Sequence, residues 1–385
     1  MKAIRKLVDN IKPTFSKDGK LSFLHSSFDA FETFLFVPDT VTHKGTHIRD
    51  SIDLKRTMIM VLIALMPALL FGMWNTGYQH SLSTGVTMDF WQSFFYGFWK
   101  ILPMIIVSYV VGLGIEVASA QIRNHEVNEG YFVTGMLIPL IMPVDLPLWM
   151  LALAVAFSVI IGKEVFGGTG MNIWNPALIA RAFAFFAYPS FMSGDKIWVS
   201  GLSKGQGIID GFSGATPLAN AQAGLDIPSL QDMFLGFIPG SVGETSTLAI
   251  LLGAVLLLIT GIASWRIMVS VFAGGLLIGL LFNAVAPSPD SYLALPAWYH
   301  LVMGGFAFGA VFMATDPVTS SQTNSGKWIY GFLIGAFAVT IRVFNPGYPE
   351  GMMLSILLMN TFAPLIDYVV VQKNIKRRVK RAVIK

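Results

Sequence analysis

The chain has no cysteine among its 385 residues. This absence excludes disulfides, thiolate-held iron–sulfur clusters and blue-copper centres within the chain. Its six histidines do not pair at one depth of two apolar segments in the way that a b-type haem requires. No metal site is therefore expected. Any electrons that the protein handles must be carried by an organic cofactor, for which flavin is the simplest candidate.

Charged residues are scarce as well. They make up 12% of the chain, against roughly a quarter in soluble domains, while hydrophobic residues reach 54%. This composition is typical of a polytopic membrane protein. The net charge of +4 does not indicate nucleic-acid binding, because the cations gather at the two ends of the chain. A Gly-rich turn between a strand and a helix, of the dinucleotide-binding type, is also lacking.

The apolar segments predict an all-α fold with about ten transmembrane helices. Several segments are shorter than the ~20 residues of a full crossing and contain glycine or proline. Broken helices of this kind are tolerated where they line a cavity inside the protein. The expected spans are 57–74, 95–115, 130–143, 147–162, 174–192, 246–262, 267–284, 298–314, 328–342 and 351–370.

The distribution of charge predicts the orientation of the chain. Ten Lys or Arg residues lie within 1–56 and seven follow Asp367, which together are 17 of the 26 cations. Because cytoplasmic segments carry the excess of Lys and Arg, both termini are expected in the cytoplasm of a bacterium, with the spans in its inner membrane. The loop 193–245 has two lysines against five acidic residues and is expected on the periplasmic side.

The two halves of the apolar region look like copies of one unit. The stretch from Gly135 to Pro147 lines up with that from Gly275 to Pro287 through shared Gly, Leu, Ile and Pro positions. Five spans per half would make the second copy enter from the opposite face, as an inverted repeat. The predicted organisation is an arm at 1–56, repeats at 57–192 and 246–370, the loop 193–245 between them, and a basic tail at 371–385.

The N-terminal arm contains an apolar stripe. Phe28, Phe31, Phe34 and Leu35 recur at helical spacing, with acidic residues between them. This pattern predicts an amphipathic helix that lies on the membrane surface.

A loop of small residues in the 193–245 region presents one hydroxyl group. It reads Asp210-Gly211-Phe212-Ser213-Gly214-Ala215-Thr216-Pro217. Its glycines allow backbone angles that other residues avoid, Pro217 stops a helix from extending backwards, and Asp210 and Ser213 can stabilise turns. The Thr216 side chain is therefore expected to be accessible.

Further motifs give the chain a family resemblance. The Thr216 loop, the segment 47–56, Asn124-His125-Glu126-Val127-Asn128-Glu129-Gly130-Tyr131 and the stretch from Gly162 to Ala177 resemble the B subunits of the sodium-translocating NADH:quinone reductases nearly end to end. The related membrane flavin subunit of the Rnf complex is the nearest alternative, and the longer N-terminal arm favours the quinone reductase.

The resemblance implies a urea-channel-like fold and a set of partners. FMN would be attached to Thr216 through a phosphoester by a flavin transferase that reads Asp210 and Ser213. Riboflavin would bind near Asn172 and Asn175, although Asn175 is equally suited to cap the helix that follows. Electrons would reach ubiquinone or menaquinone and drive sodium transport. NADH would be oxidised on another subunit of a six-subunit complex.

The resemblance also implies sites for quinone and sodium. A glycine pair of the family corresponds here to Gly112 and Gly114, because Leu113 replaces the second glycine. Glu116 and Asp367 match acidic positions associated with sodium entry, while ordinary interfacial solvation is the alternative for Asp367. Phe183 and Phe185 match aromatic residues that constrict the cation path.

Two other functions remain open from sequence. An Rnf-type subunit would keep the covalent flavin and pass electrons to ferredoxin or NAD. A redox-silent channel or solute carrier of the same fold would use the Thr216 loop only as a turn.

Overall fold

A computed structural model describes most of the chain. The described residues are 2–15, 19, 21, 22, 28, 32, 36, 42–46, 48, 54–123, 130–205, 208, 209, 212–289, 291–345, 347 and 350–383. They form helices and no strand. The all-α fold expected from the composition is confirmed for this part of the chain.

Within the described residues, six helices are long and apolar enough to cross a membrane. They are α3 (Leu54–Thr84), α4 (Phe90–Arg123), α6 (Leu148–Gly162) with the turn Glu164–Phe166 that continues it, α12 (Trp265–Val285), α15 (Asn324–Phe344) and α16 (Met352–Val383). Three shorter apolar helices accompany them, namely α5 (Tyr131–Ile141), α7 (Pro176–Ala187) and α11 (Thr247–Ile259). A polytopic membrane protein is the architecture that these elements indicate.

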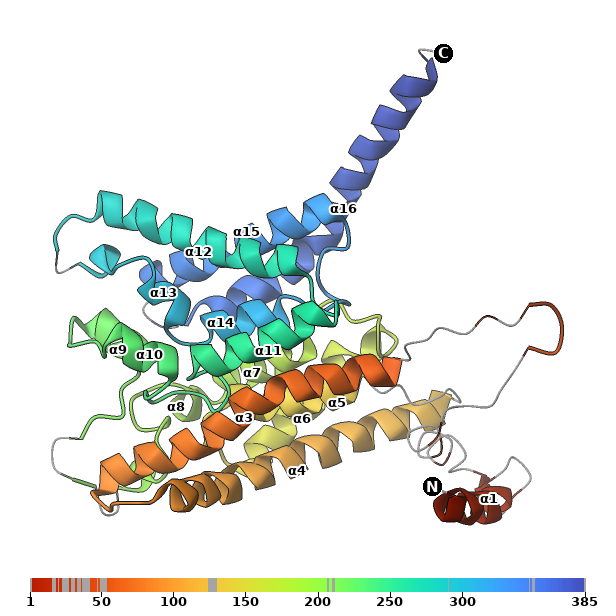
Figure 1. The fold of residues 1–385 in the computed structure, drawn as a ribbon, viewed down its shortest axis with the longest axis horizontal. Coiled ribbons are helices and arrows are strands. Elements are labelled where there is room, and N and C mark those ends of the chain that lie inside the picture. Colours follow the sequence, from red (N-terminus) through yellow and green to blue (C-terminus); the bar gives the residue numbers. More distant parts are fainter. Residues whose placement is uncertain are drawn as a thin grey trace.

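The short helices lie between two groups of long ones (Figure 1). In the lower group α3 packs on α4, and α4 packs on α6. In the upper group α12 packs on α15, and α15 packs on α16. Helix α11 packs against α3, and α7 touches α16, so that the short helices join the groups. One cluster of buried apolar side chains extends through both groups.

Corresponding helices of the two groups run in opposite directions (Figure 1). Helix α3 starts at the end of the bundle where the N- and C-terminal segments lie, whereas α11 runs toward that end. Helices α4 and α12 are also opposed. The short helices α9 (Pro217–Ala223) and α10 (Leu230–Leu235) lie at the other end. The Thr216 loop and the two terminal segments are thus at opposite ends of the bundle.

Two of the predicted spans are interrupted. The segment 174–192 consists of α7 and the single turn α8 (Pro189–Met192), which begins after Tyr188. The segment 298–314 begins with α13 (Tyr299–Val302), which Met303–Gly305 separates from α14 (Phe306–Phe308). The π-helical turn η5 (Gly309–Met313) follows α14 directly. Gly304 has φ +59°, which only glycine adopts readily.

Other predicted boundaries differ from the observed ones. Helix α3 continues to Thr84, ten residues beyond the predicted end at 74, and α4 begins at Phe90. Helix α16 passes through residue 370 without a break, so the basic tail is a continuation of the last span as far as Val383. The apolar residues Phe31, Phe34 and Leu35 of the predicted amphipathic helix lie outside the described residues, so this prediction is not tested.

The sequence alignment that suggested a repeat matches two helices that are not equivalent in the fold. Gly135 lies in the short helix α5, whereas Gly275 lies in the full-length helix α12. These two positions are therefore not equivalent in the fold, because a shared pattern of small and apolar residues also arises in unrelated apolar helices.

Helices α3 and α4 approach each other through glycine. A methyl group added at Gly97 of α4 would overlap the backbone carbonyl of Met73 on α3, and one at Gly77 would overlap the backbone of Ser93. Gly114, on the same helix α4, is exposed and has no atom within 4 Å of such a group.

We therefore expect Gly97→Leu to separate the two helices and to lower the free energy of unfolding by about 1–3 kcal/mol, the usual cost of overpacking. Gly114→Leu is the matched control and should leave the unfolding midpoint unchanged. Thermal unfolding of the purified chain in detergent measures both. Equal midpoints for the two variants would show that the close approach of α3 and α4 is not needed.

Candidate functional site

Thr216 lies in the wall of a cavity of about 220 Å³ at the α9 end of the bundle. We call this space the outer cavity. Residues from α7, the segment 192–198, α9, the segment 238–245 and the break at Met303–Gly305 line it. Its polar and aromatic lining includes Arg181, Phe185, Asp195, Trp198, Thr216, Gln222, Ser241, Glu244, Thr245 and Glu350.

Local sequence explains how Thr216 is held there. Its hydroxyl oxygen caps α9 by accepting a hydrogen bond from the Ala219 amide at 3.3 Å, and Pro217 occupies the first helical position. Ser213 Oγ accepts from the Ala215 amide at 3.3 Å, which closes the turn before it. Thr216 is half-buried, rather than freely accessible as its loop suggested. Asp210 lies outside the described residues.

A buried arginine joins two glutamates at the floor of the outer cavity. Arg181 of α7 donates to Glu244 at 2.7 Å and pairs with Glu350. Gly305 brings the broken helix close to both carboxylates, because a Cβ there would lie 2.5 Å from Glu244 Oε1 and 2.7 Å from Glu350 Oε1. The two acids thus offset the buried charge of Arg181.

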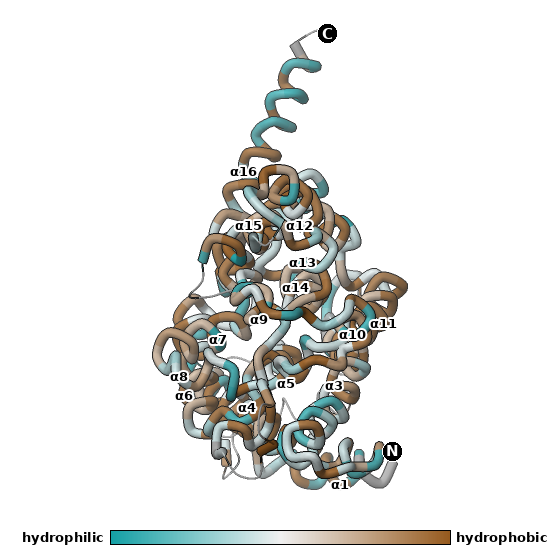
Figure 2. The backbone as a smooth tube through the Cα atoms, turned by 90° about the vertical axis from the view of Figure 1, so that its left-hand side faces the viewer, coloured by the Kyte–Doolittle hydropathy of each residue, from teal (hydrophilic) through white to brown (hydrophobic). Residues whose placement is uncertain are grey.

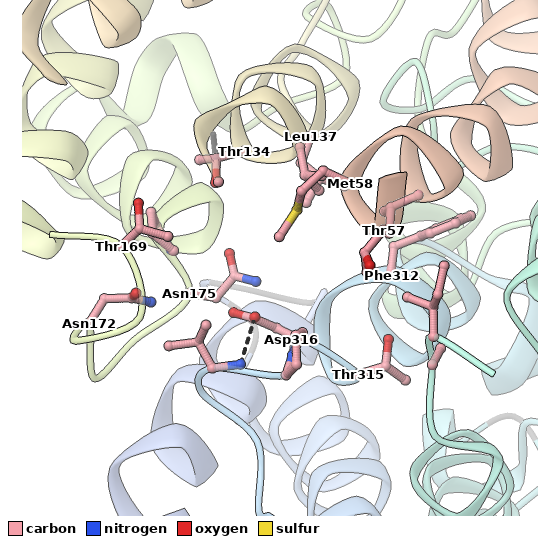
Figure 3. Close-up of a pocket in the computed structure, with 18 of the residues that line it drawn as sticks. Thr57, Met58, Thr134, Leu137, Thr169, Asn172, Asn175, Phe312, Thr315 and Asp316 are labelled. Carbon is pink, nitrogen blue, oxygen red and sulfur yellow. Dashed lines mark hydrogen bonds between the residues drawn. The ribbon is translucent and has the colours of Figure 1, made fainter. Parts of the chain in front are cut away.

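A second cavity of about 110 Å³, drawn in Figure 3, adjoins the start of α3 and therefore lies toward the opposite end of the bundle (Figure 1). We call it the inner cavity. It is enclosed by the starts of α3 and α7, part of α5, the end of α11 and the segment after η5. Its lining includes Thr57, Met58, Thr134, Leu137, Lys163, Thr169, Asn172, Asn175, Phe312, Thr315 and Asp316.

Asn172 and Asn175 both line the inner cavity, as their shared assignment to riboflavin requires. The Asn175 side chain also caps α7, accepting from the amides of Ala177 at 3.0 Å and Leu178 at 3.4 Å. The backbone N–H of Asn175 donates to Asn360 Oδ1 at 3.3 Å. The capping role and a position on the cavity are therefore compatible in one residue.

Asp316 is a carboxylate of this cavity that the sequence did not single out. In Figure 3 its side chain and that of Asn175 point toward each other. Its oxygens accept from the Val318 amide at 3.1 Å and the Thr319 hydroxyl at 2.9 Å, which closes the turn after η5. An acid at the end of an apolar segment, followed by Pro317, was the signal that could have identified it.

Glu116 forms a buried ion pair with Lys163. The two side chains are each 4% exposed, and the ammonium of Lys163 also lies 5.9 Å from the centroid of the Tyr131 ring. Lys163 stands where α6 ends and lines the inner cavity. The carboxylate assigned to sodium thus already has a counter-charge within the chain.

Asp367 is fixed by several donors. Its carboxylate accepts from the hydroxyls of Ser321 at 2.7 Å and Thr323 at 2.6 Å, and from the amides of Gln322 at 2.7 Å and Thr323 at 2.9 Å. These bonds tie α16 to the start of α15, where Thr323 is the N-cap. Asp367 therefore has a structural role besides any role in transport.

The two glycines assigned to quinone lie on different faces of α4, and the two phenylalanines assigned to the cation path lie on different faces of α7. Gly112 is buried against the Tyr131 ring, whereas Gly114 is exposed. Phe185 lines the outer cavity, but Phe183 stacks on Phe157 at 4.5 Å and faces a separate apolar groove. Residues two apart on a helix do not share a face, so neither pair forms one contact surface.

The same three-residue arrangement occurs in the first and in the second half of the described chain. Gly112 of α4 accommodates the ring of Tyr131, over which Lys163 lies. Gly275 of α12 accommodates the ring of Phe306, and the guanidinium of Arg342 lies 5.8 Å from that ring. Each glycine belongs to a long helix, each ring opens a short one, and each cation lies near the end of another long helix. This arrangement gives a match between the halves that the sequence alignment missed.

The Glu116–Lys163 pair yields a stability prediction. Glu116→Gln or Lys163→Met alone should cost about 3–5 kcal/mol of unfolding free energy, because either change leaves one buried charge uncompensated. The double variant should recover most of this loss. Arg123→Gln is the control, since Arg123 is 41% exposed in its pair with Glu164, and it should cost no more than about 1 kcal/mol. Denaturation of the purified chain gives all four values, and additive losses in the double variant would contradict the pairing.

Known proteins match the chain over almost its whole length. The profile of the NQR2, RnfD, RnfE family matches residues 41–376. A protein of Chromohalobacter salexigens, named as the B subunit of a Na(+)-translocating NADH-quinone reductase, is 49% identical over 404 aligned residues, which cover 98% of this chain and 96% of the relative. One of the same name from Ectopseudomonas mendocina is 48% identical, over 99% of this chain and 100% of the relative. These matches confirm the resemblance seen in the sequence. The chain therefore belongs to the NQR2, RnfD, RnfE family, with full-length similarity to the members that are named as B subunits of the quinone reductase.

Proposed function

We propose that this chain is the membrane subunit of a redox-driven sodium pump that binds FMN covalently at Thr216 and riboflavin in the inner cavity. In this proposal it passes electrons to a quinone and works with the other subunits of a six-subunit complex. The observation that carries the proposal is the position of Thr216, whose hydroxyl lies on a cavity floored by buried charged side chains. The full-length similarity to relatives named as subunits of a sodium-translocating quinone reductase supports it.

The residues around Thr216 fit a tethered flavin. Thr216 supplies the hydroxyl for a phosphoester, and the aromatic side chains of Phe185 and Trp198 provide surfaces on which a planar ring system can stack. Arg181 and the carboxylates of Glu244 and Glu350 offer charged groups at the cavity floor. When bound, FMN would supply electron transfer.

The inner cavity fits an uncharged flavin with a polyol chain. Thr57, Thr134, Thr169 and Thr315 bring hydroxyl groups to it, and Asn172 brings an amide. These groups can donate and accept hydrogen bonds along a ribityl chain. Met58, Leu137 and Phe312 supply apolar contacts. Riboflavin without a phosphate suits this site, because Asp316 would repel a second negative charge.

The two cavities lie toward opposite ends of the bundle. The outer one adjoins α9, and the inner one adjoins the start of α3, near the termini. We propose that the loop end is periplasmic, that both termini are cytoplasmic in a bacterial inner membrane, and that ten membrane segments form two inverted five-helix repeats. The opposed directions of α3 and α11 and the twice-occurring glycine, ring and cation arrangement support this topology.

Sodium and quinone would use residues near the inner end. We propose that Glu116, Asp316 and Asp367 supply oxygen atoms along the cation path, since carboxylates are the hard ligands that a dehydrating cation needs. Phe185 would narrow that path at the outer cavity, whereas Phe183 faces away from it. Gly114 leaves an open strip on the exposed face of α4, where a lipid-soluble quinone could approach.

Thr216→Ala removes the oxygen that would bear the phosphoester and should abolish covalent flavin fluorescence on a denaturing gel, in a host that contains the flavin transferase. Thr216→Ser should retain part of it, and Asp210→Ala should reduce it. Ser193→Ala removes another hydroxyl from the outer cavity and should have no effect. A fluorescent Thr216→Ala chain would show that the flavin is attached to another residue, whereas an unsubstituted chain without covalent fluorescence would favour a redox-silent carrier.

The absence of cysteine allows a direct test of orientation. Leu225, between α9 and α10, is 61% exposed, and Arg381 near the end of α16 is exposed as well. In cells whose outer membrane alone has been permeabilised, a membrane-impermeant maleimide should label Leu225→Cys. It should label Arg381→Cys only after the inner membrane is broken as well. Labelling of Arg381→Cys in intact cells would overturn the proposed topology.

A further inference from the structure

The last helix extends well beyond the bundle. The C-terminal part of α16 leaves the packed helices at the end where the termini lie, and it turns away from the direction of the other long helices (Figure 1). Figure 2 views the bundle roughly along those helices, and there the same segment projects past the outline of the rest of the protein. From residue 371 to 382 every side chain is exposed except that of Gln372, which is intermediate.

This projecting segment has two chemically different sides. Val371, Ile375 and Val379 recur every four residues and form an apolar stripe, with exposed fractions of 44%, 46% and 57%. Ala382 extends the stripe by almost one more turn. The opposite side carries the cations Lys373, Lys376, Arg377, Lys380 and Arg381, while Arg378 flanks the stripe beside Val371 and Ala382. The segment is therefore a basic amphipathic helix.

The segment also lacks the acidic residues that usually balance the cations of a solvent-exposed helix. No acidic residue follows Asp367 in the chain, although seven cations do. A solvated helix of this composition has no Glu–Lys pairs at a spacing of four residues and carries repulsive like-charge pairs instead. An external anionic surface would offset this repulsion, and an apolar layer beside it would cover Val371, Ile375 and Val379.

We propose that residues 371–382 form a membrane-surface anchor that binds anionic phospholipids. The occupant is the anionic lipid surface itself: the apolar stripe inserts at the boundary of headgroups and acyl chains, and the cations contact the phosphates. Three observations favour a lipid surface over a protein partner. The segment continues directly from a membrane span, it projects sideways from the bundle, and its charges are all of one sign. The anchor does not depend on flavin binding at either cavity.

The cysteine-free background permits a site-specific test with the full-length chain. Val379→Cys on the apolar stripe is labelled with an environment-sensitive fluorophore and the chain is reconstituted into nanodiscs of phosphatidylcholine, with or without phosphatidylglycerol. With phosphatidylglycerol the label should shift its emission to shorter wavelength, and quenching by acrylamide, which is uncharged, should fall a few fold. High salt should weaken both effects, because it screens the charges.

Two variants control the experiment. Arg377→Cys, labelled in the same way on the opposite side of the helix, should remain open to acrylamide in both lipids. Introducing Lys373→Glu, Lys376→Glu and Lys380→Glu into the Val379→Cys chain should remove the response to phosphatidylglycerol while the unfolding midpoint of the bundle stays the same. A label at residue 379 that is equally quenched in both lipids would overturn the proposal. Protection that requires partner subunits and ignores lipid charge would also overturn it, and would assign this face to a protein.

Discussion

The guanidinium of Arg342 donates hydrogen bonds to backbone carbonyl groups around the break in the helix, where no helical hydrogen bond is available to them. It is fully buried and donates to the carbonyl oxygens of His300 at 2.7 Å, Met303 at 3.2 Å and Glu350 at 3.3 Å. Within a membrane, an unsatisfied carbonyl costs several kcal/mol, so non-helical chain persists only where the protein itself provides donors. The break at Met303–Gly305 exists because Arg342 meets this requirement, and the left-handed conformation of Gly304 then sets the path of the chain.

Both cavities follow from interruptions of this kind. The outer cavity is lined by Gly304 and Gly305, and by the segment that precedes α11. The inner cavity lies where α7 begins at the capped Asn175 and where the chain leaves η5 at Asp316. Short helices end inside the bundle at these points and leave room that a continuous helix would fill. Buried charges are then needed to stabilise the ends, and the same charges give each cavity its chemistry.

The sequence predicted the class of fold and those site residues whose position depends on neighbouring residues in the chain. Thr216 and Asn175 could be found because a hydroxyl or amide before proline at the start of a helix is a pattern of neighbouring residues. Separation of Phe183 from Phe185, and of Gly112 from Gly114, was also predictable from helical periodicity, which places residues two apart on different faces. A repeat was expected, but the sequence alignment paired the wrong glycines, because Gly, Leu and Pro recur in many apolar helices.

Long-range pairs could not be predicted in this way. Glu116 and Lys163 are 47 residues apart, and Arg181 lies in α7 whereas Glu350 lies between α15 and α16. Their association depends on how the helices pack, and no local pattern encodes it. The Asp367 carboxylate likewise receives donors from a turn 44–46 residues earlier. Glu116 and Asp367 looked available for sodium in the sequence, whereas the fold gives each of them a structural partner.

The proposed electron transfer by this chain depends first on a flavin attached at the outer cavity. The most direct measurement is the mass of the fragment from residue 205 to 266, which trypsin releases because no Lys or Arg lies between Lys204 and Arg266. In protein purified from its native membrane, the account predicts an addition equal to FMN less one water, which fragmentation places on Thr216. An unmodified fragment, or the same addition on another residue, would contradict it.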